Sequence, residues 1–123
     1  MRFAANVVVL LVAVEHLWFL VLEMFLWQKP LGLKTFRNSA EAARETAVLA
    51  ANQGLYNGFL AAGLLWSLLV ADAGEAFRLQ TFFLSCVAAA GLYGGFSASR
   101  SILWVQGLPA VIGLMVLWGF RTA

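Results

Sequence analysis

The stretch FAANVVVLLVAVEHLWFLVLEMFLW, residues 3–27, decides the fold class of this chain. It is almost entirely apolar, and it is long enough to cross a bilayer, which takes about 20 residues of helix. It also carries Glu15, His16 and Glu23, and no small-residue cleavage site follows it, so it differs from a signal peptide. We interpret this stretch as a transmembrane helix that contains ionisable side chains.

The composition extends this interpretation to the whole chain. Of the 123 residues, 63% are hydrophobic and 11% are charged, whereas about a quarter of the residues in soluble domains are charged. A soluble domain of this length also leaves much of its surface in water. We therefore predict one integral membrane domain, residues 1–123, whose main partner is the lipid bilayer. No basic patch is interleaved with aromatic residues, which argues against binding nucleic acid.

Further apolar stretches follow at residues 46–71, 77–96 and 102–120, so the sequence predicts four spans. Short connections require antiparallel neighbours, and we predict an all-α, up-down-up-down four-helix bundle in the membrane. Pro109 lies inside the last span and predicts a kink there. The longer first connection ends in NSAEAARET, in which Asn38 and Glu41 fit a capping box. This pattern predicts a short helical extension before the second span.

The orientation follows from the lysine and arginine residues that flank the spans. The first and third connections contain Lys29, Lys34, Arg37, Arg44 and Arg100. The opposite side contains Arg2, Arg78 and Arg121. This bias favours a multi-pass protein of the cell's inner (plasma) membrane, with the first loop in the cytoplasm and both termini outside.

The second span begins with NQGLYNGFLAAG, residues 52–63, and presents three different faces at 100° per residue. One face carries the polar side chains of Asn52, Gln53, Tyr56 and Asn57. A second face carries Gly54, Gly58 and Ala62 and suits close helix packing, including contact between copies of the chain in a homo-oligomer. The third face carries Leu55, Phe59 and Trp66, and we expect it to contact lipid.

Polar side chains from all four predicted spans fall at a similar depth in the bilayer. Glu23 lies about two helical turns closer to the first loop than His16, and the amides of the returning second span fall at a similar depth. We predict an intramembrane polar chamber in this half of the bilayer and an almost purely apolar other half. The candidate acid–base residues are Glu23, His16 and Glu15. The candidate ligand-binding residues are Asn52, Gln53, Tyr56, Asn57, Tyr93, Gln106 and Trp27.

Each candidate also has a purely structural interpretation. Buried ionisable residues in a membrane usually have a function, but Glu23 and His16 could instead fix helix packing. The amides could likewise form hydrogen bonds between helices and contact no ligand. One histidine and two carboxylates without HxxxH or CxxC spacing do not make a metal site, and we predict neither a metal nor a cofactor.

Several segments together resemble the domain of unknown function 1304 family of small bacterial membrane proteins. The resemblance rests on EHLWFLVLEMFLWQKPLG at 15–32, NQGLYNGFLAAGLLW at 52–66, FFLSCVAAAGLYGG at 82–95 and VQGLPA at 105–110. It covers nearly the whole chain and implies a four-helix membrane protein. It implies no particular reaction, ligand or cofactor.

Three functional hypotheses follow. The first is a protein that binds or converts a small amphiphilic or lipid-soluble molecule by proton transfer, for example in a double-bond isomerisation, with Glu23 as acid or base and His16 as its partner. The second is a small proton-coupled transporter that acts as a dimer. The third is a structural or assembly subunit of the membrane, in which the polar cluster only specifies how the helices pair.

Overall fold

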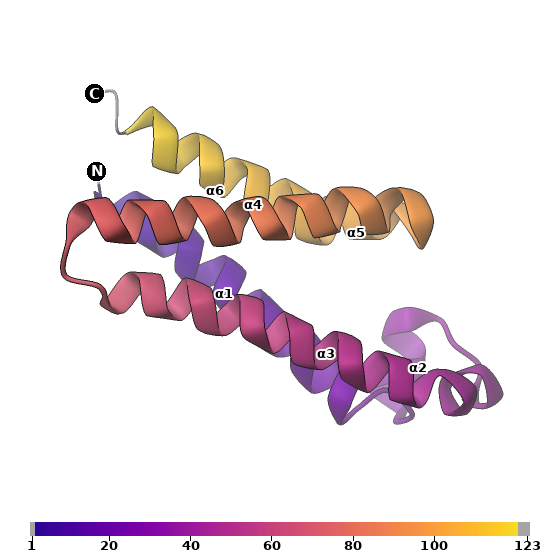
Figure 1. Cartoon of the computed structure of the whole chain (residues 1–123). Helices are drawn as coiled ribbons and strands as arrows, with labels where there is room; N and C mark the ends of the chain where they lie inside the picture. The colour runs from indigo at the N-terminus through magenta and orange to yellow at the C-terminus, as the bar shows by residue number, and fades with distance from the viewer. Residues whose placement is uncertain (1, 121–123) are drawn as a thin grey trace. The chain divides into compact units, whose positions relative to one another are not determined.

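A computed structural model describes residues 2–120, and this part of the chain is helical and contains no strand. The elements in chain order are α1 (Arg2–Met24), α2 (Pro30–Phe36), α3 (Ala40–Leu69), α4 (Ala73–Ser97), α5 (Arg100–Ile102), the π-helical η1 (Leu103–Gly107) and α6 (Leu108–Gly119) (Figure 1). The predicted all-α class is therefore confirmed for the described residues. Arg121, which was used to predict the orientation, lies outside them.

Within the described residues, three helical stretches are long and apolar enough to cross a membrane: Phe3–Met24, Ala73–Ser97 and Arg100–Gly119. They correspond to the first, third and fourth predicted spans. The remaining long helix, α3, has 30 residues, but Asn52, Gln53 and Asn57 lower the hydropathy of its apolar part. A four-helix membrane bundle therefore stays a prediction.

The described chain forms two compact units. Unit 1 contains the residues up to Ala13 and those from Ala62 onward, and unit 2 is Val14–Ala61. Helices α1 and α3 contribute residues to both units.

In unit 1, α4 packs antiparallel against the continuous run of α5, η1 and α6 (Figure 1). Gly91 faces Gly107 so closely that a Cβ atom on Gly91 would lie 2.5 Å from the Gly107 Cα. One turn further along α4, a Cβ atom on Gly95 would lie 2.8 Å from the Leu103 Cβ. Small residues at such positions let helix backbones approach each other, as they do in membrane proteins.

The π-helical segment η1 lies directly before Pro109. Proline has no N–H group, and its ring crowds the preceding turn of an α-helix. Here the Leu108 N–H donates to the Leu103 carbonyl, five residues back, which widens the turn. The kink expected at Pro109 stays a prediction, and the π-helical turn before the proline was not predicted.

In unit 2, the end of α1 packs antiparallel against α3. A Cβ atom on Gly54 would lie 2.7 Å from the Met24 Cγ, and one on Gly58 would lie 2.6 Å from the Leu20 Cδ1. The small-residue face therefore packs against α1 of the same chain at these two glycines, while Ala62 is exposed. Leu55, Phe59 and Trp66, expected to face lipid, are all exposed.

The helix α2 was not predicted. Pro30 occupies its first turn, where a missing N–H costs nothing. Gly32 packs against the chain that leaves α1, because a Cβ atom there would overlap the Leu26 carbonyl oxygen and lie 2.9 Å from the Trp27 carbonyl oxygen. Arg37 ends α2 with φ 54°, in the left-handed region, and Asn38 N–H then donates to the Leu33 carbonyl at 3.0 Å.

The predicted helical extension is confirmed, because α3 runs without a break from Ala40. The predicted cap is wrong by one residue. The Ser39 hydroxyl, rather than the Asn38 side chain, accepts the hydrogen bond of the Ala42 N–H at 3.1 Å. Ala42 is thus the third residue of the helix, and Glu41 lies one position too early to complete a capping box.

Candidate functional site

The centre of the candidate site is a hydrogen bond between two helices of unit 2. Asn57 of α3 donates from Nδ2 to Oε2 of Glu23, at 2.7 Å. The Asn57 side chain is only 3% exposed, and Glu23 lies in the last turn of α1. The sequence grouped these two residues by depth and face, and the structure joins them directly.

The glycines beside this pair make the short bond possible. Gly54 lies one turn before Asn57 on α3, and a Cβ atom there would lie 3.0 Å from the Glu23 Cβ. Gly58 follows Asn57 and leaves room for Leu20. Asparagine has a short side chain, so it reaches the Glu23 carboxyl only because these two helices approach closely.

The other two ionisable candidates lie further back along α1. His16 is fully buried and contacts Phe19 edge-on, with the ring centroids 5.3 Å apart. It precedes Glu23 by seven residues, which is about 10.5 Å along a helix. Glu15 is partly buried, and its Oε2 has no hydrogen-bond partner among the described residues. A buried polar atom without a partner costs about 1–3 kcal/mol.

The remaining polar residues of the predicted amide face point outward. Asn52 is exposed, and its Nδ2 donates to the Val48 carbonyl of its own helix at 2.9 Å. Gln53 and Tyr56 are exposed as well, and the Tyr56 ring lies near that of Phe59. Of the four polar residues on this face, Asn57 alone is buried.

Trp27 connects the three helices of unit 2. Its indole Nε1 donates to the Thr46 hydroxyl at 3.2 Å, and its ring lies 4.7 Å from that of Phe36, centroid to centroid. Thr46 in turn donates to the Ala42 carbonyl. Trp27 thus holds α2 and α3 at the end of α1, a structural role in addition to the ligand contact predicted for it.

The last two candidates belong to unit 1. Tyr93 lies on α4 and is exposed, and Gln106 lies in η1 and is partly buried. Gln106 directly precedes Gly107, at the close contact between η1 and α4.

One buried polar pair was not predicted from the sequence. In unit 1, Gln80 of α4 donates from Nε2 to Oδ1 of Asn6 on α1, at 3.1 Å, and Gln80 is only 4% exposed. The expectation that the half of the bilayer away from the first loop is almost purely apolar stays a prediction, and this pair lies on the parts of α1 and α4 that the sequence assigned to that half. Both residues lie inside predicted spans, and their amide side chains were the signal that could have revealed the pair.

Among residues 2–120, no three histidine, cysteine or acidic side chains are placed together so that they could hold a metal ion.

Comparison with known proteins places these residues in a family. The family model described as "Protein of unknown function (DUF1304)" matches residues 10–118. The chain belongs to the DUF1304 family. A relative, the uncharacterized protein YpaA of Lactococcus lactis subsp. lactis (strain IL1403), is 31% identical over 109 residues, which cover 86% of this chain and 89% of YpaA. No solved structure matches.

The match to the DUF1304 family covers the candidate site. Glu15, His16, Glu23 and Asn57 all fall inside residues 10–118, as do Tyr93 and Gln106. Asn6 lies outside this range.

Proposed function

We propose that this chain is an integral membrane protein that binds a small amphiphilic or lipid-soluble molecule at the Glu23–Asn57 pair and transfers a proton to or from it. The bond between Asn57 Nδ2 and Glu23 Oε2 is the observation that carries the proposal. Within the apolar stretch Phe3–Met24, a carboxyl group is costly to keep, and such residues usually have a function.

The geometry of the pair suits proton transfer. An amide N–H can donate to the carbonyl oxygen of a protonated carboxyl group and equally to a carboxylate oxygen. The bond to Asn57 therefore survives when Glu23 gains or loses a proton, and it keeps the carboxyl group oriented. Glu23 can then take a proton from one atom of a bound molecule and return it to another.

The neighbouring groups supply further contacts in this proposal. The unpaired Oε2 of Glu15 can accept a hydrogen bond from a ligand. His16, two turns from Glu23 on α1, would act on a different part of the same molecule or as a second proton carrier. The exposed Asn52, Gln53 and Tyr56 lie on the outer surface of unit 2, where a lipid-soluble molecule would first meet α3.

The test compares small molecules that co-purify with the full chain in mild detergent, measured by mass spectrometry. The variants are Glu23→Gln and, as a matched control, Glu41→Gln, which makes the same chemical change at an exposed residue of α3. Glutamine still offers Asn57 an acceptor, so Glu23→Gln should remain folded. We expect a ligand that is lost from Glu23→Gln and retained by Glu41→Gln. The same small molecules in all three proteins would contradict the proposal.

A structural role is the second candidate, and the glycine packing in unit 2 favours it. In that case the Glu23–Asn57 bond only fixes how α1 and α3 pair. Glu23→Gln would then leave the co-purifying small molecules unchanged, whereas Gly58→Leu would disrupt the packing of α1 against α3, because even a Cβ atom there meets the Leu20 side chain at 2.6 Å. Size-exclusion chromatography in detergent shows which variants stay folded, and the small molecules that co-purify with Glu23→Gln separate this role from ligand binding.

A further inference from the structure

The segment between α1 and α3 carries positive charge only. Lys29, Lys34 and Arg37 are all exposed, and residues 25–40 contain no aspartate or glutamate. Arg44, further along on α3, differs because the exposed carboxylates Glu41 and Glu45 lie beside it. Opposite charges three residues apart on a helix compensate each other. Among the cations of residues 25–45, those without a neighbouring carboxylate are therefore the ones on and around α2.

Helix α2 and the residues that flank it are held beside the end of α1, and these cations are held there with them. Gly32 packs directly on the backbone of Leu26 and Trp27, and Phe36 contacts the Trp27 ring. The Trp27 indole is in turn hydrogen-bonded to Thr46. Because these contacts involve both neighbouring helices of unit 2, α2 is docked where the apolar stretch Phe3–Met24 ends.

Exposed apolar side chains lie close to the cations in the sequence and on the same unit. Phe25 is 65% exposed, and Met24 and Leu31 are exposed as well. Apolar and cationic side chains next to each other, with a tryptophan nearby, are typical of segments that lie at the boundary between hydrocarbon and headgroups.

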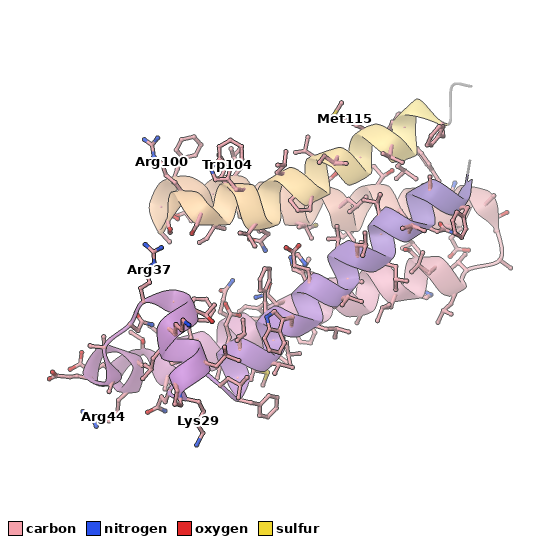
Figure 2. All side chains as sticks on the ribbon, turned by 180° about the vertical axis from the view of Figure 1, so that it is seen from behind. Lys29, Arg37, Arg44, Arg100, Trp104 and Met115 are labelled. Atoms are coloured by element: carbon pink, nitrogen blue, oxygen red, sulfur yellow. The ribbon has the colours of Figure 1, made fainter. Side chains whose placement is uncertain are left out.

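Two of these cations, Lys29 and Arg37, point in different directions. Figure 2 shows Lys29 and Arg37 on opposite sides of unit 2, with Arg44 on the same side as Lys29. Lys29 and Arg37 therefore do not converge on one point, as they would in a site for a single soluble anion. Charges distributed around the end of a helix fit a layer of separate anionic groups instead.

We propose that Lys29, Lys34 and Arg37 bind anionic phospholipid headgroups in the leaflet where α1 ends. This inference rests on the membrane insertion in the proposed function but not on ligand binding at Glu23. Cations next to an anionic membrane surface attract its lipids electrostatically, and docking by Gly32 keeps α2 in position for that contact.

The experiment measures lipid binding to the full chain by native mass spectrometry in mild detergent, with equal amounts of dioleoyl phosphatidylglycerol and dioleoyl phosphatidylcholine. The charge-removing variant is K29Q/K34Q/R37Q, and the matched control K29R/K34R/R37K keeps every charge. We expect the wild type and the control to prefer phosphatidylglycerol, and the preference to fall by about fivefold or more in the charge-removing variant. High salt should weaken the preference of the wild type.

Three results would overturn the inference. The charge-removing variant could keep the full preference, or the charge-preserving control could lose it, which would mean that the side chains act through structure. Inorganic phosphate could displace phosphatidylglycerol, which would identify a soluble anion as the ligand.

Alkaline extraction of membranes separates the two proposals. A chain that washes off the membrane refutes membrane insertion. A chain that stays in the membrane but shows no lipid preference refutes this inference alone. Glu23→Gln should leave the preference unchanged.

Discussion

Replacing Gly32 with alanine tests how α2 is held at the end of α1. The added methyl group would overlap the Leu26 carbonyl oxygen and lie 2.7 Å from its carbon. These are backbone atoms, which cannot rotate away as a side chain can. α2 must therefore move as a whole and disturb its contact with Trp27.

The expected change in the free energy of docking α2 is the difference between two effects. Overpacking costs about 1–3 kcal/mol, and contact with backbone atoms places Gly32→Ala near the upper value of about 3. Alanine inside a helix is favoured over glycine by about 1 kcal/mol. The net cost for docked α2 is about 2 kcal/mol, which raises the population of the undocked state roughly thirtyfold.

The assay is limited trypsin digestion of the full chain in mild detergent. Lys34 lies in the last turn of α2, so cleavage after it requires local unfolding and follows the population of the open state. Peptide mass spectrometry should show cleavage after Lys34 accelerated roughly thirtyfold in Gly32→Ala. The matched control is Gly119→Ala, because a Cβ atom at that position meets nothing within 4 Å, and its cleavage rate should equal that of the wild type. An unchanged rate in Gly32→Ala would refute the backbone contact, and equal acceleration in both variants would show a general effect of alanine.

Two further predictions concern unit 1. Gly91→Ala places a Cβ atom 2.5 Å from the Gly107 Cα, so it should lower stability by about 1–3 kcal/mol; circular dichroism during thermal unfolding in detergent measures this, and an unchanged midpoint would contradict the close helix contact. The Asn6–Gln80 bond should show a coupling energy of about 0.6 kcal/mol in a double-mutant cycle of Asn6→Leu and Gln80→Leu, and strictly additive effects would mean that the bond contributes nothing.

The candidate site was predictable from the sequence only in part. Helical periodicity assigned Asn57 and Glu23 to faces that could meet, and counting residues along the spans placed them at one depth. The same argument applied equally to Asn52, Gln53 and Tyr56, which are exposed. A difference of a few tens of degrees in helix rotation decides which side chain is buried, and the periodicity of a single helix does not contain that angle.

The sequence by itself determined that the four long apolar stretches are helical and that Gly54 and Gly58 form a packing face. These properties depend on hydropathy and on side-chain size within one segment, so they can be read locally. The tertiary structure decided that Asn57 is the residue that binds Glu23, that Asn6 binds Gln80, and that α2 forms and docks through Gly32. Each of these depends on atoms far apart in the chain, and only the packing of one helix against another brings such atoms within bonding distance.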